Sequence, residues 1–181
     1  MRTPRALVVL AAVVLTACQS QRTVLSDAQK AALADSARTI VRTMVANANK
    51  LDFASYFNDY SADADARYVE NGALVPSLDA FKKEYADMAP MLDSLTNMVT
   101  TIDALVLGPD AVAVTMPDPF VIKAKGRAAA KAEGVWTAII QRRNGKLQIV
   151  QTHESWVNPE AVMAAIMGPP TPPAKGVATK K

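Results

Sequence analysis

The amino-acid sequence predicts an α+β fold, in which helices near the N-terminus pack against a curved antiparallel sheet. Three observations support this fold class. Between residues 26 and 88, apolar residues recur mostly every three or four positions, which is the period of a helix. From Met98 onward the period is two, which is typical of strands. Asn144-Gly145 then separates two strand-like runs and predicts a tight hairpin.

The first helix is predicted to begin after Ser26, because Ser26 and Gln29 match a capping box. Apolar residues follow at helical spacing between positions 33 and 51. Asp52 can cap a second, short helix that carries four aromatic residues on one face: Phe53, Tyr56, Phe57 and Tyr60. This stripe indicates either a packed core or a tyrosine hydroxyl that faces a cavity.

A strand is predicted over residues 66–72, ending at a turn where Gly72 is free to take a positive φ. Ser77 then predicts the start of a third helix with an apolar stripe between positions 78 and 88. Pro90 ends or kinks this helix.

Residues 98–107 and 111–116 predict an antiparallel pair of strands joined by a Gly-Pro-Asp turn. Pro117 and Pro119 interrupt the following strand, which indicates an edge or a bulge, because proline cannot donate a hydrogen bond to a neighbouring strand.

The Asn144-Gly145 pair favours a two-residue type I′ turn, since both residues tolerate positive φ. Such a turn sets the register of the hairpin and pairs Trp136 with His153. Side chains alternate across a strand, so His153 is expected to face the interior and Glu154 to face away. The predicted inner face consists of Trp136, Ala138, Ile140, Leu147, Ile149, Gln151 and His153.

A last helix is predicted after Asn158, which would cap it, with Pro159 in the first turn and Glu160 near the positive helix end. Gly168 can end this helix.

The N-terminus predicts export and lipidation. Arg2 and Arg5 precede a short, almost uninterrupted apolar run, which suits a signal peptide and is too short to span a bilayer. The run ends in Leu-Thr-Ala-Cys18, which resembles the bacterial lipobox. We therefore expect a signal peptide over residues 1–17 and a lipidated Cys18 at the start of a linker over residues 18–25; the alternative is a plain secretory signal. Gln19 after the cysteine indicates the outer membrane of the bacterial cell envelope, facing the periplasm.

The folded domain is expected over residues 26–167, followed by a disordered tail rich in proline and lysine over residues 168–181. An alternative role for the tail is a ligand for a proline-reading partner. Five of the 20 basic residues lie in the signal peptide and the tail, against 17 acidic residues in the whole chain. The domain itself is therefore slightly acidic, and no nucleic acid is expected as a partner.

The stretch GVWTAIIQRRNGKLQIVQTHES, residues 134–155, resembles the closing hairpin of the nuclear transport factor 2-like superfamily. The resemblance is to its SnoaL-like and ketosteroid-isomerase-like bacterial members, and Asp52 after the first long helix also fits. It implies a cone-shaped sheet around a pocket closed by helices, and a possible homodimer through the sheet. It does not imply one activity, because members include isomerases, cyclases, dehydratases and non-catalytic binding domains. The tyrosine and two acids of the isomerase have no residue-by-residue match here.

Three interpretations of the single histidine remain open. As a binding protein, the domain would hold a small apolar ligand in a pocket lined by Tyr56, Tyr60, Trp136, Gln151 and His153. As an enzyme, an isomerase, dehydratase or cyclase, it would use His153 as the acid–base group, Tyr56 or Tyr60 as a donor and Asp52 as an orienting acid. In the third interpretation, His153 and Ser155 only make hydrogen bonds inside the sheet, because buried polar groups need hydrogen-bond partners. The sequence favours binding without catalysis.

No cofactor or metal is expected. The chain has one histidine, and its neighbour Glu154 points to the other side of a strand, so the pair is no zinc motif. The sequence also has no glycine-rich phosphate loop.

Overall fold

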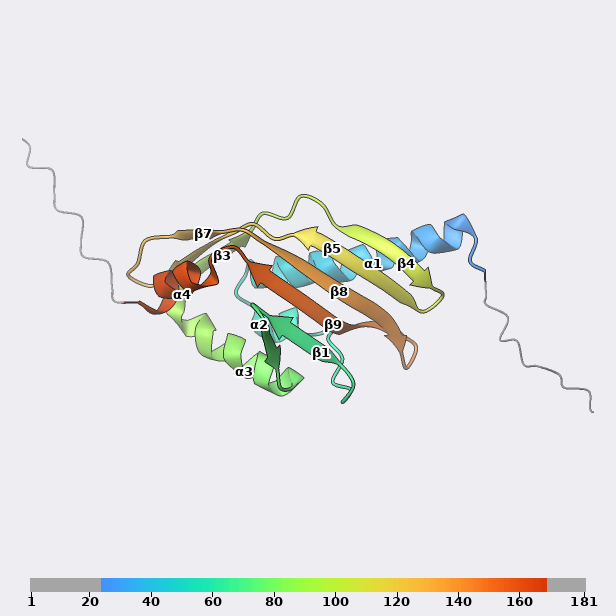
Figure 1. Cartoon of the computed structure of the whole chain (residues 1–181), viewed down its shortest axis with the longest axis horizontal. Helices are drawn as coiled ribbons and strands as arrows, with labels where there is room; N and C mark the ends of the chain where they lie inside the picture. The colour runs from blue at the N-terminus through green and yellow to red at the C-terminus, as the bar shows by residue number, and fades with distance from the viewer. Residues whose placement is uncertain (1–23, 169–181) are drawn as a thin grey trace, which may run out of the picture.

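Two β-sheets and four α-helices make up residues 24–168, the part of the chain that the computed structural model describes (Figure 1). The larger sheet has six strands in the order β2-β1-β9-β8-β5-β4, and the smaller has three in the order β3-β6-β7. Neighbouring strands are antiparallel except β1 and β9, which are parallel. The α+β class with a curved, largely antiparallel sheet and N-terminal helices is therefore confirmed.

The α-helices are α1 (Asp27–Ala48), α2 (Phe53–Tyr56), α3 (Leu78–Met88) and α4 (Pro159–Met167), and a short 3₁₀ helix, η1, covers Ala89–Met91. The strands of the larger sheet are β1 (Arg67–Glu70), β2 (Ala73–Val75), β4 (Asp103–Gly108), β5 (Ala111–Pro117), β8 (Gly134–Arg143) and β9 (Lys146–Trp156). Those of the smaller sheet are β3 (Leu92–Asn97), β6 (Phe120–Ala124) and β7 (Ala130–Ala132).

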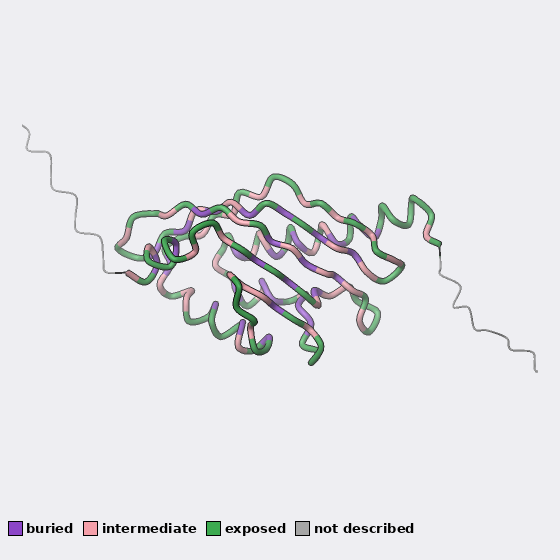
Figure 2. Tube along the Cα trace, viewed as in Figure 1, coloured by how far each residue is buried: buried purple, intermediate pink, exposed green. Residues whose placement is uncertain are grey.

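The helix α1 begins at the predicted capping box. The Ser26 hydroxyl accepts from the Gln29 backbone N–H, and the Gln29 side chain accepts from the Ser26 backbone N–H. Its buried side chains, among them Leu33, Val41 and Met44, face the larger sheet, and Figure 2 shows buried positions following α1 and the middle of the long strands. This burial of one face holds the helix against the sheet.

The aromatic stripe expected on the second helix begins in α2 and continues beyond its end, because α2 stops at Tyr56. Phe53, Tyr56, Phe57 and Tyr60 are all buried and contact two rings of α3, Phe81 and Tyr85. Asp52 caps α2 by accepting from the Ser55 backbone N–H at 3.1 Å. Both predictions about this segment, the cap and the packed stripe, are confirmed.

Two local predictions were wrong in part, and one strand was not predicted. The strand expected over residues 98–107 begins only at Asp103. Strand β3 was not predicted, because its residues are mostly polar; it pairs with β6. Asn158 adopts a left-handed conformation with φ 56° and caps α4 with no side-chain hydrogen bond.

The proline-interrupted stretch is the corner at which the chain passes from one sheet to the other. β5 ends at Pro117, and β6 begins at Phe120 in the smaller sheet. Between them, the Asp118 backbone N–H donates to the Gly134 carbonyl at 2.9 Å, which ties the corner to the start of β8. The prolines therefore mark a change of sheet.

The hairpin of β8 and β9 has the predicted turn, with φ 50° at Asn144 and 82° at Gly145. The register is as expected as far as the pair Ile140 and Ile149. Val150 is then an extra residue on β9, a β-bulge, so Ile139 pairs with Gln151 and Trp136 pairs with Glu154. The predicted pairing of Trp136 with His153 is wrong, because one extra residue exchanges the two faces of the strand.

The bulge has a visible cause. Ile149 bonds through its backbone to a second segment: its N–H donates to Asp59 at 2.8 Å, and its carbonyl accepts from Ser61 at 2.9 Å. Two residues later, β9 pairs with β1 instead. A strand that forms backbone hydrogen bonds first with one segment and then with another bends between them, and the bulge at Val150 provides that bend.

The predicted signal peptide, Cys18, and the tail beyond Gly168 lie outside the described residues. None of the helices within residues 24–168 combines the length and the apolar character needed to cross a membrane.

Candidate functional site

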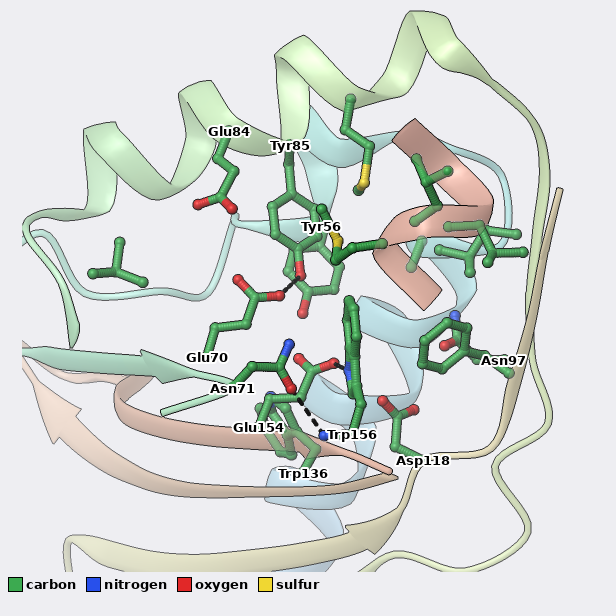
Figure 3. Close-up of a pocket in the computed structure, with 18 of the residues that line it drawn as sticks. Tyr56, Glu70, Asn71, Glu84, Tyr85, Asn97, Asp118, Trp136, Glu154 and Trp156 are labelled. Carbon is green, nitrogen blue, oxygen red and sulfur yellow. Dashed lines mark hydrogen bonds between the residues drawn. The ribbon is translucent and has the colours of Figure 1, made fainter. Parts of the chain in front are cut away.

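A cavity of about 690 Å³ lies between the inner face of the larger sheet, α3, α4 and the last turns of α1 (Figure 3). Most of its wall is apolar, with side chains such as Met44, Met88, Met116, Phe120, Ile122 and Ile166. The volume and the apolar wall suit a small organic molecule.

The structure brings together only two of the predicted pocket residues. Tyr56 and Trp136 are buried and line the cavity. Tyr60 is buried outside the lining, where its hydroxyl donates to the Tyr56 hydroxyl at 3.2 Å. Gln151 and His153 point away on the exposed outer face of the sheet.

His153 is therefore not in the pocket, and the prediction that it contacts a ligand there is wrong. The bulge at Val150 is the reason, because it turns residues 151, 153 and 155 outward. The Nε2 atom of His153 lies 3.0 Å from the Ser155 Oγ, both exposed, so the pair satisfies itself at the surface and not inside the sheet.

Asp52 is also outside the cavity. Its carboxylate is exposed and engaged with the start of α2, and hydrogen bonds from Ser55 lower its pKa. A helix cap is thus its role in the fold, and the predicted constellation of His153, Asp52 and Tyr56 does not form.

In their place, the lining carries five acidic residues, of which Asp87 is exposed and paired with Lys83. The other four follow one another from the exposed edge of the cavity inward, and we call them the acidic row: Glu84, Glu70, Glu154 and Asp118. Glu84 comes from α3 and is exposed, and Glu70 ends β1. Glu154 is opposite Glu70 in the parallel β1–β9 pair, so both side chains face the cavity. Asp118 stands at the corner between the two sheets.

Glu154 is buried, with 8% of its surface exposed. The indole Nε1–H of Trp156 donates to its Oε1 atom. Burial raises the pKa of Glu154 well above the usual carboxyl range, and the neighbouring charges of Glu70 and Asp118 raise it further. Glu154 is therefore the member of the acidic row that holds its proton most firmly.

Asp118 is 5% exposed, and burial raises its pKa to about 6. A side-chain hydrogen bond with Glu154 opposes this shift, because a protonated Glu154 stabilises an ionised Asp118. Two interacting carboxyl groups with separated pKa values form a pair that carries one proton near neutral pH. Of the two carboxyls, Glu154 is the one whose pKa burial and the charges of Glu70 and Asp118 raise well above the usual range.

Glu70 lies nearer the mouth. The Tyr85 hydroxyl donates to its Oε1 atom at 3.0 Å, and the Tyr85 ring stacks on that of Tyr56 at 5.5 Å between centroids. Burial raises the pKa of Glu70 to about 7, with a further contribution from the charge of Glu84. Burial likewise raises the pKa of both tyrosines, so their hydroxyls stay protonated as donors.

Sequence reasoning missed all four acidic residues of the row. Glu154 had been placed on the outer face by the uniform register. The position of Asp118 could have indicated a site residue. An acidic residue between two prolines lies where a strand is interrupted, so the alternation of faces no longer determines which way its side chain points. Glu70 and Glu84 differ in no visible way from surface carboxylates until the fold is known.

The lining contains no lysine, arginine or histidine, although it contains acidic residues at several positions. Within residues 24–168, no three histidine, cysteine, aspartate or glutamate side chains gather closely enough to hold a metal ion. The chemistry available to the described residues is therefore proton transfer and hydrogen bonding by carboxyl and phenol groups in an apolar surrounding.

Comparisons with known proteins place the fold. A candidate scytalone dehydratase from Novosphingobium aromaticivorans superposes with a TM-score of 0.66 at 8% identity, over 73% of this chain and 89% of that one. A candidate dehydratase of the NTF2-like family from Streptomyces avermitilis superposes with a TM-score of 0.59 at 15% identity, over 68% of this chain and 95% of that one. The chain has the nuclear transport factor 2-like fold.

A third similar structure with this nuclear transport factor 2-like fold is a hexachlorocyclohexane dehydrochlorinase, LinA-type3, from Novosphingobium barchaimii. It gives a TM-score of 0.59 at 13% identity, over 72% of this chain and 90% of that one. No protein-family model and no curated protein matches the sequence. At these identities the likeness concerns the fold alone.

Proposed function

We propose that the domain is an acid–base catalyst that moves a proton on a small, largely apolar substrate, in an elimination or an isomerisation. The observation that carries the proposal is the Glu154–Asp118 pair at the inner end of an apolar cavity. The two environments separate the pKa values of the pair: that of Asp118 is raised to about 6, and burial beside two other carboxyls raises that of Glu154 well above the usual range. This is the combination that a proton transfer needs.

The roles follow from the two environments. Asp118 is the carboxylate that accepts a proton from carbon, because its pKa of about 6 leaves it ionised at pH 7 and above. Glu154 is the acid, which donates a hydrogen bond to a carbonyl oxygen or a leaving group. Because the wall is apolar, these interactions are stronger than they would be in water.

The similar structures support this choice of reaction class. Two are named as candidate dehydratases and one as a dehydrochlorinase. Eliminations of the kind that these names denote need a base to remove a proton and an acid to assist the leaving group. The acidic row supplies both to this chain.

Binding without turnover is the second candidate function. The observation in its favour is that two carboxyl groups of the row already accept hydrogen bonds, Glu70 from Tyr85 and Glu154 from Trp156. Such groups can serve as fixed polar contacts for a ligand.

A model elimination distinguishes the two candidates. The aromatic probe 5-nitrobenzisoxazole opens when a base removes its ring C–H proton: the electron pair forms a nitrile as the N–O bond breaks, and a coloured phenolate leaves. We expect turnover by the intact protein and a loss on the order of 100-fold in Asp118→Asn. His153→Ala, which changes the outer face, is the matched control and keeps the rate. Bound probe with equal rates in the protein and in Asp118→Asn would favour binding alone.

We also propose that the domain acts at a membrane of the bacterial cell envelope, held by lipid on Cys18. This proposal is supported by the sequence before Cys18, as multiple acyl chains give stable anchoring. The protein expressed in a Gram-negative host should partition into detergent with a mass increase from acylation, and Cys18→Ala should abolish both. Recovery of the intact protein in the aqueous phase, processed at another residue, would exclude the anchor.

A further inference from the structure

The acidic row leaves carboxyl groups facing one another with no counter-charge in the cavity wall. Glu70 and Glu154 are direct neighbours on adjacent strands, and Glu84 raises the pKa of Glu70 from the mouth side. Because Glu154 is the carboxyl that holds its proton most firmly, the negative charges that face each other are those of Glu70 and Glu84. The lining offers no lysine, arginine or histidine to offset them.

We propose that the cavity selects a small molecule with a protonated amine on an apolar body, and that its ammonium group is bound between Glu70 and Glu84. The inference rests on the proposed use of this cavity and adds the chemical class of its ligand.

The surroundings of Glu70 suit an ammonium group. One of its oxygens is occupied by the Tyr85 hydroxyl, which fixes the carboxylate in place. Tyr85 and Tyr56 stack on each other with an interplanar angle of 17°, so their ring faces are turned toward one another, and Tyr85 approaches Glu70 through its hydroxyl. An ammonium group there gains charge-assisted hydrogen bonds to the carboxylate oxygens that remain free.

The rest of the cavity suits the apolar body. Beyond Glu70, the wall consists of Trp136, Phe120 and Ile122 on the sheets and Ile166 on α4. A ligand anchored at Glu70 can therefore extend toward Asp118 and Glu154, the pair proposed to transfer the proton. An anionic ligand would place its charge among carboxylates and be rejected by repulsion.

A metal ion is the other conceivable cation, and the arrangement does not suit it. Within residues 24–168 no group of three metal-binding side chains exists. The acids are spread along the wall, so the described residues do not surround any one point with the several oxygen ligands that a metal ion needs.

The test uses three probes of nearly equal shape: 4-tert-butylbenzylamine, the corresponding benzyl alcohol and the corresponding benzoate. Binding to the full-length protein is measured by calorimetry at about pH 8, where Glu70 is ionised and the amine is protonated. The chain has two tryptophans, Trp136 and Trp156, and both line the cavity, so their fluorescence gives a second readout.

We expect the amine to bind at least about tenfold more tightly than the alcohol, and the benzoate to bind most weakly. Glu70→Gln and Glu84→Gln should remove most of the preference for the amine and leave alcohol binding within about twofold. Glu84 is exposed, so its variant has little reason to misfold. Asp103→Asn, an exposed acid on β4 outside the cavity, is the matched control and should keep the preference.

Equal affinities for amine and alcohol, or a preference that survives in both glutamine variants, would overturn this inference and leave the cavity as a ligand site. Failure of all three probes to bind would overturn the proposed function as well.

Discussion

Glu154 lies directly opposite Trp136 in the β8–β9 ladder, the position that an uninterrupted hairpin would have given to His153. One extra residue, Val150, decides which of two neighbouring titratable side chains enters the cavity. A carboxyl group thereby replaces an imidazole at the centre of the candidate site.

The exchange of faces can be tested by cysteine accessibility in the full chain carrying Cys18→Ala. His153→Cys should react with a thiol reagent about tenfold or more faster than Glu154→Cys, because position 153 is exposed and position 154 is buried. Thr152→Cys, buried on the same inner face as Glu154, should react as slowly as Glu154→Cys. Fast reaction at 154 and slow reaction at 153 would restore the uninterrupted register.

Stability should fall as pH rises through the weakly acidic range. In the unfolded chain these carboxyls titrate near pH 4, whereas in the fold the pKa is about 6 for Asp118 and about 7 for Glu70. The native state therefore binds more protons between these values, and the free energy of unfolding declines from about pH 4 to pH 7. Each group contributes on the order of 1–3 kcal/mol to that decline.

Denaturant unfolding at a series of pH values checks this prediction. In Asp118→Asn the free energy of unfolding should decline less between about pH 4 and pH 6, because an amide does not titrate. In Glu70→Gln it should decline less up to about pH 7. Asp103→Asn, exposed on β4, serves as the control. A free energy of unfolding that rises over the same interval would contradict the burial of the acidic row.

Gly134 should not tolerate alanine. A Cβ atom there would lie 2.7 Å from the Ser155 carbonyl oxygen and 3.1 Å from the Trp156 ring, and the first of these is backbone that cannot move away cheaply. We expect Gly134→Ala to cost about 1–3 kcal/mol. It should also reduce activity, because the Gly134 carbonyl accepts from the Asp118 backbone.

Gly108→Ala is the matched control for this substitution. A Cβ atom at Gly108 meets nothing within 4 Å. The free energy of unfolding of Gly108→Ala should therefore stay close to that of the unsubstituted protein. Urea titration of the two variants gives the comparison, and equal values would mean that β8 and β9 do not approach closely at Gly134.

The hairpin turn should depend on Gly145. Its φ of 82° is unfavourable for a β-branched residue, so Gly145→Val should destabilise the protein by about 1–3 kcal/mol. Lys146→Val, at the next and also exposed position, is the control, because it lies in strand β9 and should change the melting temperature little.

The elements that are determined locally were predictable from the sequence. The capping box at Ser26, the cap at Asp52, the aromatic stripe and the Asn144-Gly145 turn each depend on residues within a few positions of one another, and all are present. The fold class followed from these elements and from the period of the apolar residues.

The site was not predictable in the same way, because its geometry depends on contacts between distant segments. The Val150 bulge exists because Ile149 bonds to residues 59 and 61, about 90 positions earlier in the chain. Likewise, Asp118 reaches the cavity because the chain changes sheets, and Glu70 faces Glu154 because β1 pairs with β9 in parallel. Tyr56 and Trp136 were found because their burial follows from local pattern alone.

The cavity lies near the C-terminal end of α1, far from the residue at which this helix begins. The helix has 22 residues and is therefore about 33 Å long, and only Met44, Val45 and Ala48 near its end line the cavity. The start of α1 lies at the opposite end of the molecule from α4 (Figure 1). Because α1 packs along the sheet, a lipid on Cys18 would attach the domain by the end that lies about one helix length from the cavity.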